Sequence, residues 1–188
     1  MGRNKVLLLS GLISTGKDTV AKYLVENHSY RMCVSHTTRY KRQGEVEGKN
    51  YFFIDKEKFY KMAENNEFVE MRKYFVNIDV GNGESKRGLY LYGLSKQQLK
   101  DRSKPIVIIA DKEGCEEIRR YVGECKWVHL ECDVDVIRQR AIDRGDFSAE
   151  IDRRIENDLI RFKGIEMVAD RIVDSNRELE EVVEDVLK

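Results

Sequence analysis

The residues best suited to chemistry in this sequence form a glycine-bounded turn that carries a lysine. The stretch Ser10–Thr19 has the sequence Ser-Gly-Leu-Ile-Ser-Thr-Gly-Lys-Asp-Thr and follows an apolar run at Val6–Leu9. Its two glycines permit backbone conformations that other residues resist. The N–H groups of such a turn and the positive end of a following helix can face one anion. Lys17 would then reach the outer phosphates of a nucleoside triphosphate.

The motif G-x-x-x-x-G-K has one departure in this chain. The residue after the lysine is Asp18, where a Ser or Thr that binds Mg²⁺ is usual. Asp18 would hold Mg²⁺ through a water molecule, or Thr19 would become the ligand, and the sequence leaves both open. A strand–turn–helix connection without a ligand is the alternative interpretation. The residues expected to bind the triphosphate are Gly11, Leu12, Ile13, Ser14, Thr15, Gly16, Lys17, Asp18 and Thr19.

Composition limits the class of protein. The 188 residues suffice for one core, with room for a small inserted lobe. Lys+Arg and Asp+Glu balance at 34 each, so the global charge points to neither nucleic acid nor a membrane. No apolar run approaches the roughly 20 residues that span a bilayer, and no signal peptide precedes the first strand. The four cysteines lack C-x-x-C pairing and are expected to lie reduced in the core of a cytoplasmic protein.

Apolar runs alternate with helical patterns over most of the chain, which predicts an α/β fold with a parallel sheet covered on both faces. Ligands of such sheets bind at the carboxyl ends of the strands, where the glycine turn lies. Strands are expected at Val6–Leu9, Arg31–Val34, Ile106–Ala110, Trp127–Glu131 and Arg171–Val173. Helices are expected at Asp18–Asn27, Gly114–Val122, Asp135–Asp143, Ala149–Val168 and Arg177–Leu187.

The middle of the chain, from Ser35 to Leu94, breaks this alternation. It is polar and aromatic, with a strand expected at Tyr51–Ile54 and a short helix at Lys56–Asn65. Phe68–Ile78 and Lys86–Tyr92 flank an Asn-Gly pair, which is a hairpin signal. This region is therefore predicted to be a small mixed lobe inserted into the α/β core.

Hydroxyl groups and cations are concentrated between Ser35 and Glu45. Arg39 and Arg42 lie three residues apart, so they can share one target if the segment coils. Two guanidinium groups with nearby hydroxyls suit a phosphate dianion. The residues alone leave a solvated basic loop as an equal alternative.

From this segment onward the sequence resembles the guanylate kinase family. The residues that carry the resemblance are Ser35-x-Thr37-Thr38-Arg39-x-x-Arg42-x-Gly44-Glu45, Glu47-Gly48-x-x-Tyr51-x-Phe53, Asn66-x-Phe68-x-Glu70 and Tyr92-Gly93. With the glycine turn, the resemblance covers nearly the whole chain. It implies a P-loop NTPase fold with a three-layer parallel sheet. The core would comprise residues 1–34 and 95–188, the inserted acceptor-binding lobe about 35–94 and a helical lid about 136–155.

The resemblance also implies ATP-dependent, Mg²⁺-requiring phosphorylation of GMP or dGMP by in-line transfer. Glu70 would accept hydrogen bonds from the guanine N1 and N2 groups, and loss of such a match costs about 1–3 kcal/mol. The acceptor nucleotide would contact Ser35, Arg39, Arg42, Tyr51, Glu70, Tyr92 and Asp111. The catalytic cations would be Lys17, Arg140, Arg144 and Arg154.

The lid cations belong to an arginine-rich stretch around Gly145-Asp146. Arginines delivered by a closing segment would neutralise the moving phosphoryl group, whereas two helices with solvated basic faces are the alternative. Asp174-Ser175-Asn176, after the last expected strand, would flank the adenine of the donor or simply cap a helix.

Several residues depart from the family pattern. Leu94 stands where the family has a Thr or Ser that contacts the guanine carbonyl, and Ser95 follows it. Ile109 replaces an aspartate and Glu113 a glutamine. Two other functions therefore stay open: a related kinase for another nucleoside monophosphate or ribose 1,5-bisphosphate, and a non-catalytic guanylate kinase-like binding module. Small nucleotides are the expected partners, with no nucleic acid or membrane, for a monomer or homodimer.

Overall fold

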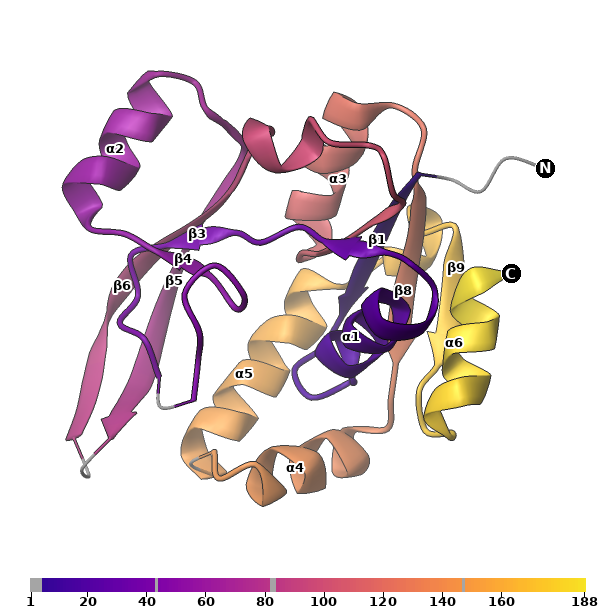
Figure 1. Cartoon of the computed structure of the whole chain (residues 1–188). Coiled ribbons are helices and arrows are strands. Elements are labelled where there is room, and N and C mark those ends of the chain that lie inside the picture. The colour runs from indigo at the N-terminus through magenta and orange to yellow at the C-terminus, as the bar shows by residue number, and fades with distance from the viewer. Residues whose placement is uncertain (1–4, 43, 82–83, 147) are drawn as a thin grey trace. The chain divides into compact units, whose positions relative to one another are not determined.

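The computed structural model describes residues 5–42, 44–81, 84–146 and 148–188 (Figure 1). The chain divides into two compact units. The first, called the core unit, comprises Met1–Met32 and Ser103–Lys188, and the second, called the inserted unit, is Cys33–Arg102.

The described part of the core unit contains a five-stranded sheet with the order β2-β7-β1-β8-β9. Every neighbouring pair is parallel, which confirms the predicted sheet. β1 lies in the middle and all of its residues are buried, as expected for a strand covered on both faces. The strands are β1 (Val6–Gly11), β2 (Arg31–Met32), β7 (Ile106–Ile109), β8 (Lys126–Glu131) and β9 (Arg171–Asp174).

Helices cover both faces of this sheet. On one face α1 and α6 share a buried apolar cluster with the strands, and Leu9, Leu130 and Val173 belong to it. On the other face α3 places Arg119 over the Trp127 ring, and the Phe162 ring, which follows α5, packs against a β8 side chain. The helices are α1 (Lys17–Asn27), α3 (Lys112–Val122), α4 (Val134–Asp143), α5 (Ser148–Arg161) and α6 (Leu179–Leu187).

Several expected elements are shorter in the structure than their sequence patterns indicated, among them the strand predicted at Tyr51–Ile54, which is only Phe52–Phe53. The helix predicted at Ala149–Val168 is wrong beyond Arg161, because Gly164 has a left-handed φ of +73° and a 3₁₀ turn, Ile165–Met167, follows it. The strand predicted to reach Val34 pairs with β7 only at Arg31 and Met32. The last helix begins at Leu179 rather than Arg177.

The described part of the inserted unit contains a four-stranded sheet with the order β4-β3-β6-β5. β5 and β6 pair antiparallel over most of their length, so the predicted hairpin is confirmed, while its Asn-Gly turn lies outside the described residues (Figure 1). The short helix packs Phe59 on Phe68, with ring centroids 4.6 Å apart. The elements are β3 (His36–Thr37), β4 (Phe52–Phe53), α2 (Lys56–Glu64), β5 (Phe68–Gly81), β6 (Glu84–Ser95) and the 3₁₀ helix Lys96–Leu99.

The four cysteines, all within the described ranges, are free thiols. Cys33 and Cys115 are buried as predicted, but Cys125 and Cys132 are only half-buried because they lie at the two ends of β8. None of the helices in the described residues is long and apolar enough to cross a membrane.

Candidate nucleotide-binding sites

The predicted phosphate loop connects β1 to α1 in the core unit. A Cβ on Gly11 would lie 2.6 Å from the Leu130 carbonyl oxygen of β8, so only glycine fits there without a shift. Gly16 caps α1 with a φ of +90°. Between them Ser14 has a φ of +55°, a left-handed conformation that is uncommon for a residue with a side chain. The loop therefore curves tightly at the carboxyl end of the central strand.

Lys17 lies folded over this loop. Its Nζ donates to the Gly11 carbonyl at 2.9 Å, to the Leu12 carbonyl and to Thr15 Oγ1 at 3.3 Å. Thr15 Oγ1 in turn donates to the Leu12 carbonyl at 3.0 Å. The loop thus holds the ammonium group through its own oxygen atoms, at the first turn of α1.

Charged groups on α1, on α5 and just after α4 act on Lys17. Burial lowers the pKa of Lys17 to about 8, the carboxylates of Asp18 and Asp158 oppose this shift, and the cations Arg154 and Arg144 add to it. Two of the predicted catalytic arginines therefore lie near the predicted phosphate loop. Both also interact with one acceptor, because Asp146 pairs with Arg144 and its Oδ2 lies 3.5 Å from Arg154 Nη1.

Arg140, the third predicted lid arginine, contacts the residues that follow β8 and β9. Its Nη2 donates to the Ser175 carbonyl at 3.0 Å, and its Nη1 lies 3.6 Å from Cys132 Sγ. Arg140 thus ties α4 to the segment after β9 rather than joining the other two arginines.

Asp158 is a site residue that the sequence interpretation missed. Its Oδ2 accepts the Ile13 backbone N–H of the phosphate loop at 2.9 Å, and its Oδ1 lies 3.3 Å from Arg161 Nη1. Burial raises the pKa of Asp158 above its ordinary value, although the Ile13 N–H and the charges of Lys17 and the arginines oppose this shift. The helical spacing of Arg154, Asp158 and Arg161 puts them on one face, a signal that the sequence contains.

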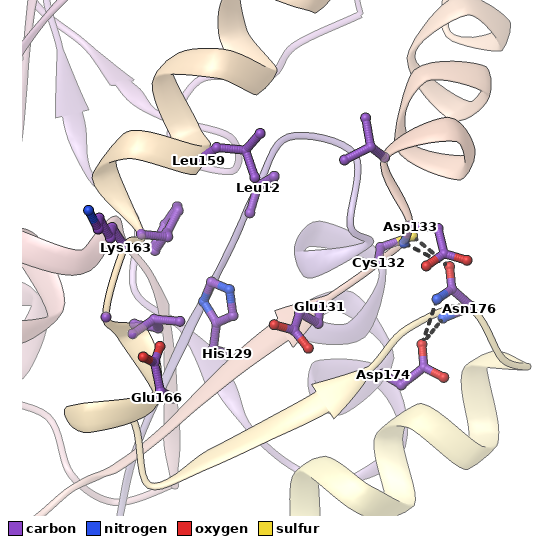
Figure 2. Close-up of a pocket in the computed structure, with 14 residues that line it drawn as sticks. Leu12, His129, Glu131, Cys132, Asp133, Leu159, Lys163, Glu166, Asp174 and Asn176 are labelled. Carbon is purple, nitrogen blue, oxygen red and sulfur yellow. Dashed lines mark hydrogen bonds between the residues drawn. The ribbon is translucent and has the colours of Figure 1, made fainter.

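A groove of about 590 Å³ opens beside the phosphate loop, over the ends of β8 and β9 (Figure 2). Asn176 closes one side, where its Oδ1 accepts from Cys132 Sγ at 3.0 Å and from the Asp133 N–H at 3.2 Å. The lining residues are Leu12, His129, Glu131, Cys132, Asp133, Val134, Leu159, Phe162, Lys163, Gly164, Ile165, Glu166, Asp174 and Asn176. Since four of them are carboxylates, the groove suits a hydroxyl- and amino-bearing nucleoside better than a phosphate.

His129, on the wall of this groove, belongs to a buried hydrogen-bond chain. Trp127 Nε1 donates to Ser10 Oγ at 2.7 Å, and Ser10 Oγ lies 2.9 Å from His129 Nδ1. Trp127 can only donate, so the Ser10 hydroxyl accepts from it and keeps its own proton free to donate to Nδ1 when that nitrogen is unprotonated. Burial, with a smaller contribution from the Lys17 charge, lowers the pKa of His129 to about 4, so the ring is neutral.

The predicted acceptor residues of the inserted unit gather around Arg39. Arg39 is 4% exposed, and its guanidinium makes a two-bond pair with Glu45, Nη1 to Oε2 at 2.9 Å and Nη2 to Oε1 at 2.6 Å. Its carbon lies 5.1 Å from the Tyr51 ring centroid. Glu45 also accepts the Arg42 backbone N–H at 2.8 Å. The structure therefore adds Glu45 as the residue that orients the basic segment.

Tyr51 and Tyr92 lie together on the same side of this sheet. Their ring centroids are 5.8 Å apart, and Tyr74 lies 5.3 Å from Tyr92. Burial raises the pKa of Tyr92, and the charges of Arg39 and Arg42 oppose that shift. Tyr51, Tyr92, Arg39 and Arg42 are thus brought together, while Ser35 lies immediately before β3 and is half-buried.

Glu70, on β5, is buried next to the residue that departs from the family pattern. Its Oε1 accepts the Leu94 backbone N–H at 3.0 Å. The Leu94 side chain is fully buried and Ser95 is 4% exposed. Glu70 therefore accepts this hydrogen bond from the Leu94 backbone, because the leucine side chain has no donor.

Asp111, predicted with the acceptor set, belongs to the core unit. Its Oδ1 caps α3 by accepting the Gly114 N–H at 2.8 Å, and its Oδ2 lies 3.6 Å from Arg161 Nε. Asp18 and Thr19, the predicted metal ligands, are exposed on the first turn of α1. No group of three or more His, Cys, Asp or Glu that could hold a metal is found in the described residues. A carboxylate and a hydroxyl beside a phosphate loop nevertheless suit Mg²⁺, which usually keeps waters and substrate phosphates as its other ligands.

The parallel sheet, the strand–loop–helix connection and the loop lysine define a P-loop nucleotide-binding protein. Comparison with known proteins is more specific. The sequence pattern described as Guanylate kinase matches residues 3–186, so the chain belongs to the guanylate kinase family.

Individual relatives agree with this assignment. Over 146 residues the chain is 32% identical to the guanylate kinase of Pseudomonas fluorescens strain Pf0-1, covering 77% of this chain and 66% of the relative. Over 171 residues it is 30% identical to the guanylate kinase of Clostridioides difficile strain 630, covering 88% and 76%. The chain thus spans about two thirds of the first relative's length. The crystal structure of guanylate kinase from Anaplasma phagocytophilum has the same fold, with a TM-score of 0.69 at 24% identity and coverage of 95% and 80%.

Proposed function

We propose that this protein transfers the γ-phosphoryl group of ATP to the phosphate of GMP or dGMP. The observation that carries the proposal is the arrangement around Lys17: a glycine-bounded loop holds its ammonium group, and Arg144 and Arg154 lie close enough to shift its pKa. Phosphoryl transfer depends on positioning and on neutralising charge at the moving group, and this cluster can supply both.

The donor nucleotide would bind in the core unit. The loop N–H groups and Lys17 would hold the triphosphate, and the acid-lined groove would take the nucleoside, with Asn176 at its edge. Asp18 and Thr19 would hold Mg²⁺ together with the phosphates. A bound Mg²⁺ would neutralise charge on the phosphate oxygens. Arg140, which contacts the Ser175 carbonyl, would border the nucleoside rather than the γ-phosphate.

The acceptor nucleotide would bind in the inserted unit. Arg39, Arg42, Ser35 and the two tyrosines would hold its phosphate, and Glu45 would keep the Arg39 fork in a fixed orientation. Glu70 would face the guanine N1 and N2 groups, which adenine does not present as a pair of donors. The attacking atom would be an oxygen of the acceptor phosphate, so the reaction would need no protein nucleophile.

One observation favours an alternative acceptor. Leu94 is fully buried and its side chain offers no hydrogen bond, although the family has a hydroxyl here for the guanine carbonyl. A site that lacks this contact would discriminate less strongly between bases. A related nucleotide, or ribose 1,5-bisphosphate, is therefore the second candidate acceptor.

A coupled assay of ADP release tests the proposal. The wild type would be supplied with ATP and Mg²⁺ and with GMP, dGMP, AMP, UMP, CMP, dTMP or ribose 1,5-bisphosphate in turn. Turnover that is fastest with GMP or dGMP would support it. Turnover with another acceptor alone would reassign the substrate, and bound nucleotide without any turnover would indicate a binding module.

A further inference from the structure

The Asp158 carboxylate joins three segments of the core unit. It accepts the Ile13 N–H from the phosphate loop at 2.9 Å, and it lies 3.3 Å from Arg161 on its own helix. Arg161 Nε lies 3.6 Å from Asp111 Oδ2, just after β7. The Asp158 and Asp111 side chains are 13% and 10% exposed, so these contacts are shielded from solvent. A chain of charge-assisted contacts therefore links the phosphate loop to α5 and to the end of β7.

The contact at Ile13 lies next to the strained residue of the loop. Ser14 has a φ of +55°, and such a conformation persists only where the surroundings hold it. The Ser14 hydroxyl does not contribute, because it is buried and has no hydrogen-bond partner in the described part of the chain. The preceding N–H, in contrast, is fixed by Asp158.

The same helix carries one of the cations near Lys17. Arg154 lies four residues before Asp158, so the two share one face of α5. Arg154 acts on the pKa of Lys17. Whatever fixes this face of α5 against the phosphate loop therefore also fixes the distance between Arg154 and the loop.

We propose that Asp158 is a positioning residue that keeps the strained phosphate loop and α5 in one arrangement. The proposal rests on the assignment of the loop to the donor triphosphate made above. The hydrogen bond to Ile13 maintains the left-handed turn at Ser14, and the pair with Arg161 holds the helix to Asp111. Asp158 acts through Ile13 and Arg154 and needs no contact with the transferred group.

The first test follows the loop itself, in protein without nucleotide. Asp158→Asn keeps the shape of the side chain but removes the charge that pairs with Arg161, and Glu156→Gln makes the same change at an exposed residue of the same helix. Amide hydrogen exchange of Ile13, measured by NMR, should become about tenfold faster in Asp158→Asn, because a neutral amide oxygen accepts the Ile13 N–H more weakly than a carboxylate does. It should not change in Glu156→Gln. Unchanged exchange in Asp158→Asn would overturn the proposal.

The second test separates positioning from general stability. Asp158→Asn should lower kcat about 10²-fold, because a displacement near 1 Å at a reacting group costs that much, with less than about a threefold change in the acceptor KM. Ser14→Gly in the same chain should restore kcat about tenfold, since glycine adopts the left-handed turn without a tether. Ser14→Gly alone is the reference. Failure of this rescue would contradict the role of loop strain.

The two readouts also separate this proposal from the proposed function. If the wild type turned over neither GMP nor dGMP, the substrate assignment would fail, whereas the exchange of Ile13 would still decide for or against Asp158. A loss of kcat in Asp158→Asn that is matched by Glu156→Gln would overturn the proposal as well.

Discussion

The phosphate loop of the core unit and the basic segment of the inserted unit prepare for phosphate in different ways. In the loop, Lys17 is held by backbone and hydroxyl oxygens, and cations and carboxylates around it oppose each other. In the basic segment, Arg39 is buried and already paired in two hydrogen bonds with Glu45. The loop therefore leaves the Lys17 charge available for a ligand. In the basic segment, the Glu45 carboxylate instead fixes the direction of the Arg39 guanidinium.

The largest expected effect tests the loop side of this comparison. Lys17→Ala should reduce kcat by about 10²–10³-fold or more, because it removes a preorganised charge from the donor phosphates. The fold should remain, since Lys17 donates its hydrogen bonds to oxygen atoms of its own loop rather than joining two elements of the core. Turnover and thermal unfolding would be measured together, with Lys22→Ala on the exposed side of α1 as the control. Retained turnover in Lys17→Ala would remove the donor assignment.

The pair in the inserted unit should respond through stability. Glu45→Gln leaves the buried Arg39 without its counter-ion, which costs about 3 kcal/mol by analogy with other buried pairs. Unfolding in urea would measure this loss, and Glu64→Gln on the exposed end of α2 is the control. A loss below about 0.5 kcal/mol would mean that Glu45 does not hold Arg39 in solution.

The titratable groups of the two units should affect stability over different pH ranges. Burial lowers the pKa of His129 in the core unit to about 4, below its value of about 6.5 in an unfolded chain. The unfolded state then binds more protons, so stability falls as the pH drops from 6.5 to 4, by up to about 1.4 kcal/mol per unit. His129→Phe should flatten this slope in urea unfolding measured across that range. An unchanged slope would mean that His129 is not held neutral.

The stabilising contribution of Glu45 should be lost only at a lower pH than that of His129. Hydrogen bonds from Arg39 and Arg42 outweigh burial and lower the pKa of Glu45. Its contribution is therefore fully present above the unfolded value, about 4.3, and is lost as the pH falls through the lower folded value. Arg39 signals in an NMR titration should stay unchanged down to pH 4.3 and shift only below it. Shifts between pH 6.5 and 5 would contradict this order of events.

A smaller effect should appear in the choice of base. Glu70→Gln should weaken GMP binding about 10–100-fold, equivalent to about 1–3 kcal/mol, because it replaces a carboxylate that faces two donors. ATP binding should change little. Calorimetric titration with each nucleotide would check this, and equal losses for both would indicate that Glu70 serves the fold.

The sequence predicted the parts of these sites that depend on local chemistry. The glycines, Lys17 and the flanking strand and helix follow from spacing within one segment, and the hairpin follows from alternating residues around an Asn-Gly pair. The spacing of Asp158 with Arg154 and Arg161 indicates a shared helix face, but it cannot reveal the partner Ile13, which is 145 residues away. Glu45 belongs to the motif that was recognised, yet its pairing with Arg39 depends on a turn at Gly44 with a φ of +82°.

The arginines show a further limit of sequence patterns. Arg140 and Arg144 are four residues apart and share one motif, but Arg140 contacts the Ser175 carbonyl while Arg144 pairs with Asp146. The hydrogen-bond partner of such a long side chain depends on which oxygen atoms the neighbouring segments place within its reach. The end of α5 was likewise mispredicted, because an apolar and charged pattern continues past Gly164 although the backbone turns there.

We propose that the core unit binds the donor and that the inserted unit binds the acceptor. The most direct test is calorimetric binding of ATP and of GMP, separately, to the wild type, to Lys17→Ala and to Glu70→Gln. We expect Lys17→Ala to weaken ATP binding but not GMP binding, and Glu70→Gln to weaken GMP binding but not ATP binding. Loss of both nucleotides in either variant, or absence of GMP binding to the wild type, would contradict this proposal.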